Sequence, residues 1–170
     1  MFKKYERYRN VLVVGPHRSG TTFLTHAIAH DLSRTAVDEY QFRHNRMDLL
    51  DNILTTETGL VIQAPQALPW LPILMQPQDI AVYIVRDHTE IAESYRRSRT
   101  PKRRPIPPAP FTPAQAFRMW CKIFLQCPGS DMVEYNELYE HPLFVPKEDR
   151  ARWHYKQVDN SGKRHERKRY

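Results

Sequence analysis

An apolar run that stops at a glycine and passes directly into a helical pattern constrains the fold of this chain more than any other feature. Residues 10–14 (Asn-Val-Leu-Val-Val) hold four consecutive apolar side chains and end at Gly15. A run of this length without polar alternation indicates a strand buried on both faces, as in a parallel sheet. Residues 20–32 then repeat apolar side chains at helical spacing. The segment predicts a strand–turn–helix unit.

The rest of the chain alternates in the same way. The further predicted strands are residues 60–62, 80–85 and 132–135, and the further predicted helices are residues 45–56, 66–76, 88–99 and 113–126. Thr112 is a candidate cap for the last helix, with Pro113 in its first turn. Strands that alternate with helices imply an α/β fold: three layers, with a mainly parallel central sheet flanked by helices. Ligands of such sheets bind at the carboxyl ends of the strands.

A chain of 170 residues suits one domain, which we assign to residues 1–146. Residues 100–113 hold six of the 14 prolines and predict an extended surface loop. Residues 147–170 show no apolar period and predict a basic C-terminal tail that is disordered or ordered only by a ligand.

Net charge is distributed unevenly along the chain. The formal charge is +7, to which residues 96–104 contribute +6 and residues 161–170 contribute +4, so the remaining residues sum to −3. The first basic segment has three interpretations: a solvated face, a guide for an acidic acceptor or cofactor, or a nucleic-acid contact. We favour a small phosphorylated ligand over nucleic acid, because the body of the protein is not basic.

Several classes of protein are disfavoured by what the sequence lacks. No apolar stretch approaches the roughly 20 residues of a membrane helix, and no signal peptide is apparent. Cys121 and Cys127 form neither a disulfide framework nor a zinc site. We therefore expect a cytoplasmic chain without membrane contact.

The segment from Gly15 to Thr22 (Gly-Pro-His-Arg-Ser-Gly-Thr-Thr) is the sharpest motif. A turn between a strand and a helix directs backbone N–H groups and the helix N-terminus at one point, which suits a phosphate or sulfate. Its spacing is that of a P-loop, but Thr21 stands where the P-loop has lysine. Arg18 is a candidate replacement cation. The alternative is a glycine turn capped by Ser19 that binds no ligand.

Residues 18–24 (Arg-Ser-Gly-Thr-Thr-Phe-Leu) resemble the 5′-phosphosulfate loop of sulfotransferases that use 3′-phosphoadenosine 5′-phosphosulfate (PAPS). The resemblance implies a small form of that P-loop fold, with PAPS as cofactor and adenosine 3′,5′-bisphosphate as product. It assigns cofactor binding to Arg18, Ser19, Gly20, Thr21, Thr22 and Phe23. For Phe23 a core position is an equal alternative.

Two further segments resemble the same family, in the same order. Arg86 after a predicted strand and Ser94 eight residues later are similar to the motif that binds the 3′-phosphate. Independently of the family, a guanidinium at a strand end and a hydroxyl two helical turns on can reach one phosphate. For Arg86 the alternative is an ion pair with a nearby acid. Residues 133–138 resemble a late family segment that implies a position for Tyr135 near the adenine.

The resemblance also implies the catalytic groups. Arg18 would stabilise charge on the leaving oxygen, and an acceptor hydroxyl needs a base. Glu39, after the first helix, is our first choice, Asp38 the second, and His17 a third candidate. Another branch of the family carries a base histidine where this chain has Gln63. We expect no metal, with Asp87 as the one candidate exception.

The expected activity is transfer of a sulfuryl group from PAPS to an acceptor hydroxyl or amine. Two alternatives stay open. One is a P-loop nucleotide or nucleoside kinase-like enzyme, and the other is a non-catalytic module that binds nucleotide or nucleic acid. The sequence does not reveal the acceptor or the oligomeric state.

Overall fold

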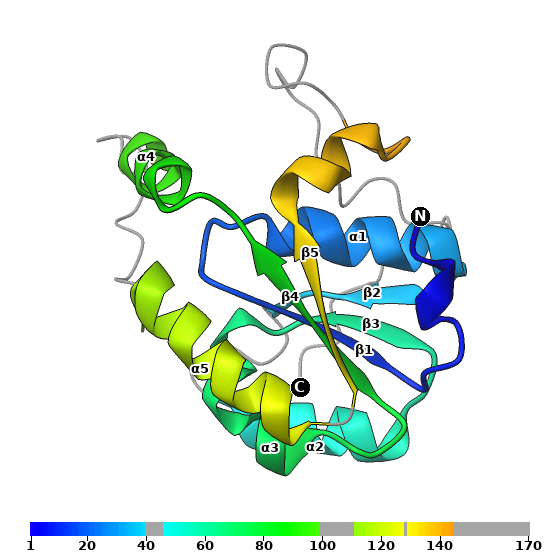
Figure 1. The fold of residues 1–170 in the computed structure, drawn as a ribbon. Helices are drawn as coiled ribbons and strands as arrows, with labels where there is room; N and C mark the ends of the chain where they lie inside the picture. The colour runs from blue at the N-terminus through cyan, green and yellow to red at the C-terminus, as the bar shows by residue number, and fades with distance from the viewer. Residues whose placement is uncertain (40–45, 99–110, 128, 145–170) are drawn as a thin grey trace.

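The computed structural model describes residues 1–39, 46–98, 111–127 and 129–144, and its centre is a five-stranded parallel sheet (Figure 1). The strand order is β2-β3-β1-β4-β5, and every neighbouring pair is parallel. The strands are β1 (Val11–Val14), β2 (Thr35–Val37), β3 (Leu60–Gln63), β4 (Ile80–Val85) and β5 (Ser130–Glu134). The predicted α/β class is confirmed.

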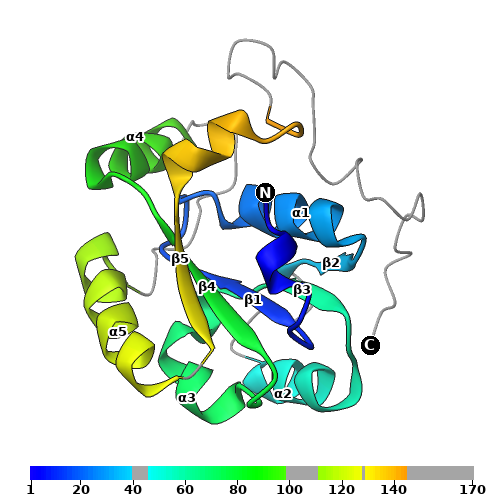
Figure 2. The ribbon, with the colours of Figure 1, turned by 45° about the vertical axis from the view of Figure 1, so that its right-hand side comes forward.

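Helices cover both faces of this sheet, as Figures 1 and 2 show from two directions. Helix α1 and the 3₁₀ helices η1 and η4 lie on one face, and α2, α3 and α5 lie on the other. The helices are α1 (Thr21–Leu32), α2 (Met47–Thr56), α3 (Leu71–Leu74), α4 (His88–Ser98) and α5 (Pro113–Gln126), with η1 (Lys3–Tyr5), η3 (Pro65–Trp70) and η4 (Tyr135–Glu140).

Strand β1 divides the core between the two faces because successive side chains of a strand point in opposite directions. Leu12 and Val14 pack toward α2, α3 and α5, whereas Val11 and Val13 pack toward α1 and η1. All four side chains are fully buried. The continuous apolar run that predicted this strand is therefore explained by helices on both sides.

Several element boundaries differ from the sequence predictions. The sequence did not predict β2, and the predicted helix 66–76 is a 3₁₀ helix with Pro69 inside it, followed by the four-residue α3. The last strand begins at Ser130, and Tyr135 opens η4. The predicted cap is confirmed, because Thr112 and Gln115 form a reciprocal capping box on α5.

Three sequence predictions concern segments that lie wholly or mostly outside the described residues. They are the proline-rich loop, most of the basic segment 96–104, and the tail from 147 to 170. Cys121 and Cys127 are both free thiols. In the described part of the chain, no helix has the length and apolar character to cross a membrane.

Candidate functional site

The loop between β1 and α1 has an unusual backbone. Gly15 and Gly20 have φ angles of 147° and 108°, and Arg18 has a φ of 69°, in the left-handed region that L side chains rarely adopt. No side chain in the described residues caps α1, whose N-cap is Gly20. The N–H groups of its first turn therefore face the loop without a side-chain acceptor, which is the arrangement that accepts an anion.

Strands β4 and β5 close this loop from the side. A Cβ atom at Gly15 would lie 2.8 Å from Ile84 Cγ2, and one at Gly20 would lie 2.6 Å from Tyr135 Cε2. Real Cβ atoms do not approach other atoms so closely, so both positions require glycine. The two glycines let the ends of the neighbouring strands pack directly on the loop.

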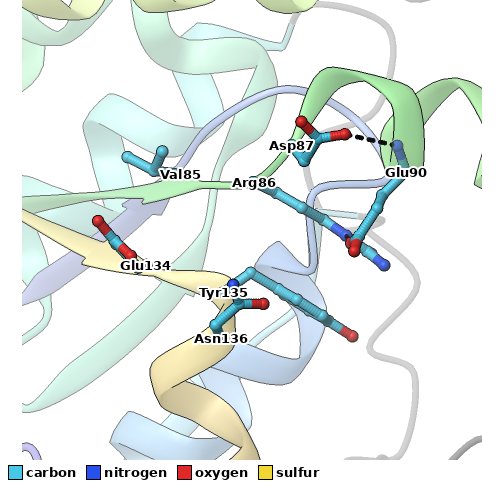
Figure 3. Close-up of a pocket in the computed structure, with 7 residues that line it drawn as sticks. All are labelled: Val85, Arg86, Asp87, Glu90, Glu134, Tyr135 and Asn136. Carbon is cyan, nitrogen blue, oxygen red and sulfur yellow. Dashed lines mark hydrogen bonds and ion pairs between the residues drawn. The ribbon is translucent and has the colours of Figure 1, made fainter.

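Arg86 connects the loop with the end of β4. Its Nη1 donates to the carbonyl oxygen of Arg18 at 3.3 Å, and its Nε donates to Glu90 Oε2 at 2.8 Å. Figure 3 shows the Arg86 side chain alongside the ring of Tyr135, with Glu90 beside the guanidinium. Arg86 thus forms an ion pair with a nearby acid, which was the alternative to phosphate binding. It also contacts the loop directly.

Arg18 and Ser94 are brought together by the fold, although 76 positions separate them in the chain. Arg18 Nε donates to Ser94 Oγ at 3.3 Å. Arg18 is exposed and Ser94 is half-buried, so both side chains are accessible to a ligand. The loop cation and the hydroxyl of the second motif thus face one another across the carboxyl edge of the sheet.

Tyr135 is 8% exposed and packs against the loop. The Arg86 guanidinium carbon lies 3.9 Å from the centroid of its ring, and Tyr139 meets the ring edge-on at 5.7 Å. Little of the Tyr135 ring is therefore exposed in this structure. Its contacts are those of a support for Arg86 and for Gly20.

The remaining loop residues divide between structural and accessible positions. The Ser19 hydroxyl and N–H both donate to the Pro16 carbonyl, at 2.7 and 3.1 Å, so Ser19 shapes the turn. Phe23 is 3% exposed and packs edge-on against His141 and Phe144, in the core position that was its alternative. Thr22 is half-buried at the start of α1.

Thr21 is 4% exposed and accepts a hydrogen bond from Gln63 Nε2 at 3.4 Å. Gln63 is the last residue of β3 and is 5% exposed. Sequence reasoning assigned it no role. The available signal was a polar residue closing an apolar strand at the edge where ligands bind.

The three candidate bases lie at the same edge of the sheet. Asp38 and Glu39 follow β2, both half-buried, and β3 separates β2 from the loop strand β1. Burial, and then the neighbouring Arg18 guanidinium, lower the pKa of His17 below its ordinary value of 6.5. His17 is therefore neutral near pH 7 and able to accept a proton.

A small cavity of about 150 Å³ lies beside Arg86 and Tyr135. It is lined by Val85, Arg86, Asp87, Glu90, Glu134, Tyr135 and Asn136, all shown in Figure 3. The cavity opens between the carboxyl ends of β4 and β5, where a parallel sheet binds its ligands.

Asp87, the candidate metal-binding acid of the sequence, accepts hydrogen bonds at the start of α4. Its Oδ1 accepts hydrogen bonds from the Thr89 and Glu90 N–H groups at 2.8 and 3.2 Å, and also from the Thr89 hydroxyl. These bonds lower the pKa of the carboxyl and hold the first turn of α4. The Oδ1 atom of Asp87 therefore caps the start of α4.

One cluster in the described residues has the spacing of metal ligands: His30, Asp31 and His141. His141 Nδ1 accepts the Leu143 N–H at 3.2 Å, so in the neutral ring the proton sits on Nε2, which lies 3.2 Å from Asp31 Oδ1. A metal at Nε2 would require loss of that proton. The cluster is therefore a hydrogen-bond network that joins α1 to the segment after η4.

No model of a known protein family matches the sequence, and no curated protein matches it. Among solved structures, the shikimate kinase from Bacteroides thetaiotaomicron is 15% identical with a TM-score of 0.51, covering 74% of this chain and 86% of that one. The shikimate kinase from Acinetobacter baumannii in complex with shikimate is 18% identical with a TM-score of 0.49, covering 79% and 87%. The first likeness shows a P-loop kinase-like α/β fold, which sulfotransferases share. Neither likeness is to a sulfotransferase.

Proposed function

We propose that this protein binds an adenosine nucleotide at the loop and transfers a sulfuryl group from PAPS to an acceptor hydroxyl or amine. The observation that carries this proposal is the contact between Arg18 and Ser94 at 3.3 Å, together with the bond from Arg86 to the Arg18 carbonyl. These bonds bring together the two segments that the resemblance assigns to the 5′-phosphosulfate and to the 3′-phosphate. A nucleotide that carries phosphate groups on both its 3′ and its 5′ oxygen needs two cationic positions of this kind.

In the proposed reaction the acceptor oxygen or nitrogen attacks sulfur and forms a new bond to it. The bond between sulfur and the 5′-phosphate oxygen breaks, and its electron pair stays on that oxygen, which leaves adenosine 3′,5′-bisphosphate. Glu39, or failing it Asp38 or His17, takes the acceptor proton. Arg18 and the N–H groups of the loop stabilise the charge that develops on the leaving oxygen.

Arg86 would hold the 3′-phosphate with Ser94. The guanidinium already donates through Nε to Glu90 and through Nη1 to the loop, and Nη2 is the nitrogen that we assign to the ligand. The stack on Tyr135 restricts rotation of the guanidinium. A pre-positioned cation of this kind loses little conformational entropy when it binds a phosphate.

Phosphoryl transfer by a nucleotide kinase-like enzyme is the second candidate, and the likeness to the shikimate kinase from Bacteroides thetaiotaomicron favours it. One solved structure that shares this fold is a shikimate kinase. Against this candidate stands Thr21, buried at the position where a P-loop lysine would reach the β- and γ-phosphates. A non-catalytic nucleotide-binding module is the remaining alternative.

Calorimetric titration separates these candidates. Adenosine 3′,5′-bisphosphate would be compared with ATP and GTP, each with and without magnesium. We expect the bisphosphate to bind without metal, and Arg18→Ala and Arg86→Ala each to weaken it by on the order of tenfold or more, the loss expected of a charged hydrogen bond. Lys122→Ala, which removes an exposed cation from α5, is the matched control.

Preference for ATP with magnesium would contradict the sulfuryl-transfer proposal and support the kinase candidate. Bisphosphate binding without turnover of PAPS, in a screen of hydroxyl and amine acceptors, would support the non-catalytic module. If turnover is found, Glu39→Gln tests the base, and retained transfer in that variant would rule Glu39 out.

A further inference from the structure

Gln63 occupies a position between the loop and the candidate bases. It ends β3, and β3 lies between β1, which leads into the loop, and β2, which leads to Asp38 and Glu39. Its backbone is in register with Val13 of β1. A polar side chain that is only 5% exposed at this point needs a hydrogen-bond partner inside the protein or in a bound ligand.

The partner of Gln63 is the Thr21 hydroxyl, at 3.4 Å from Nε2. This distance is long for an N–H···O bond, so the bond is a weak one. Because Thr21 Oγ1 accepts from Gln63, its own hydrogen is left to donate elsewhere. Thr21 is the first residue of α1, whose first-turn N–H groups face the loop.

We infer that Gln63 is a positioning residue that orients the Thr21 hydroxyl toward the transferred group, and that this neutral pair selects a group with a single negative charge. The inference rests on the proposed function and extends it to donor selectivity. A terminal phosphoryl group carries nearly two charges at neutral pH, whereas a sulfuryl group carries one. A neutral donor in the lysine position adds no positive charge to balance the second one.

Neither residue exchanges a proton in the proposed transfer. The hydroxyl of Thr21 donates to a sulfuryl oxygen while the bond to the acceptor forms and the bond to the 5′-phosphate oxygen breaks. Adenosine 3′,5′-bisphosphate lacks the sulfuryl group, so the Gln63–Thr21 pair contributes to binding of PAPS and not to binding of the product.

Calorimetry with three nucleotides tests whether the Gln63–Thr21 pair contributes to binding of PAPS alone. The nucleotides are PAPS, adenosine 3′-phosphate 5′-diphosphate, and adenosine 3′,5′-bisphosphate. The first two differ only in a terminal sulfuryl or phosphoryl group. We expect the wild-type protein to favour PAPS over the 5′-diphosphate by about tenfold, equivalent to about 1.4 kcal/mol. Gln63→Met should reduce this preference and leave bisphosphate binding unchanged. If Gln63 had a purely structural role, Gln63→Met would lower the affinity for all three nucleotides together.

Gln63→Glu sharpens the test, because a carboxylate can still bond the Thr21 hydroxyl but only by accepting from it. The hydroxyl hydrogen then turns away from the ligand and a negative charge is added, so this variant should lose more PAPS affinity than Gln63→Met. Thr21→Ser should retain the wild-type preference, and Thr21→Lys should reverse it. Lys122→Ala again serves as the control.

The inference is overturned if Gln63→Met and Gln63→Glu, with melting temperatures like that of the wild type, both keep the wild-type ratio of PAPS to 5′-diphosphate affinity. Should Thr21→Lys fail to fold, the two Gln63 variants decide the outcome. If the wild-type protein binds none of the three nucleotides, the proposed function itself is wrong and the inference falls with it.

Discussion

The guanidinium carbon of Arg86 lies 3.9 Å from the centroid of the Tyr135 ring. Arg86 follows β4 and Tyr135 follows β5, so this contact joins the carboxyl ends of two neighbouring strands. Tyr135 also packs against the loop glycine Gly20, and Arg86 also donates to the loop carbonyl of Arg18. The loop, the cation and the ring therefore form one packed unit.

Removal of the Tyr135 ring should affect both stability and ligand binding. We expect Tyr135→Ala to lower the free energy of unfolding by about 3 kcal/mol, as for other large-to-small changes at buried aromatic positions. It should also weaken binding of adenosine 3′,5′-bisphosphate, because the guanidinium loses its support. Tyr135→Phe keeps the ring and should retain both properties. Urea denaturation and calorimetry measure them, and equal affinity in Tyr135→Ala would contradict the supporting role.

A methyl group at Gly20 should destabilise the protein more than one at Gly59. Both glycines have positive φ, 108° and 75°, so each substitution to alanine introduces backbone strain of about 1–2 kcal/mol. At Gly20 the Cβ atom also overlaps Tyr135, whereas at Gly59 no atom of the described residues lies within 4 Å. The overlap should add about 1–3 kcal/mol to the loss in Gly20→Ala. Equal losses in urea denaturation would argue against close packing of Tyr135 on the loop.

The Glu90 carboxylate should compete with a ligand phosphate for Arg86. The two side chains are 2.8 Å apart, with exposed fractions of 16% for Arg86 and 44% for Glu90. We expect Glu90→Gln to raise the affinity for adenosine 3′,5′-bisphosphate by roughly threefold, the scale of a partly exposed ion pair. Glu93→Gln removes the same charge from an exposed position on α4 and is the control. Weaker binding in Glu90→Gln would mean that Glu90 positions Arg86 and does not compete with the ligand.

The free energy of unfolding should decrease in two separate ranges as the pH is lowered. Burial lowers the pKa of His141 below 6.5, against an opposing effect of Asp31, so the folded protein binds fewer protons than the unfolded chain. The stabilisation is complete above about pH 6.5 and is lost as the pH falls through the folded pKa of His141.

Asp31 contributes to the second range, together with other carboxylates whose pKa is lowered by hydrogen bonds, such as Asp87. Burial raises the pKa of Asp31, but hydrogen bonds from the Met1 amino group, the Phe2 N–H and the two histidines outweigh burial and lower the pKa below 3.8. Stability therefore falls again below about pH 3.8. Denaturation at several pH values measures both losses. His141→Gln should reduce the first loss, with the remainder expected from His17, whose pKa is also lowered below 6.5, and His88→Gln, at an exposed position of α4, should leave it unchanged.

Local signals in the sequence were sufficient for the elements that carry the site. The apolar run before Gly15 predicted β1, the periodicity after it predicted α1, and Thr112 with Pro113 predicted the start of α5. Strand β2 was missed because it has three residues, two of them half-buried, and so shows neither an apolar run nor a clear alternation. Short edge strands depend on their neighbour for their conformation.

The contacts that define the site were decided by tertiary structure. The order β2-β3-β1-β4-β5 places the loop strand between β3 and β4, which brings Gln63 to Thr21 on one side and Arg86 to Arg18 on the other. Spacing along the chain does not encode such pairings, since strand order and register follow from the packing of both faces of the sheet. The sequence by itself determined that an anion-binding turn leads from a buried strand into a helix. Only the fold decided which side chains meet there.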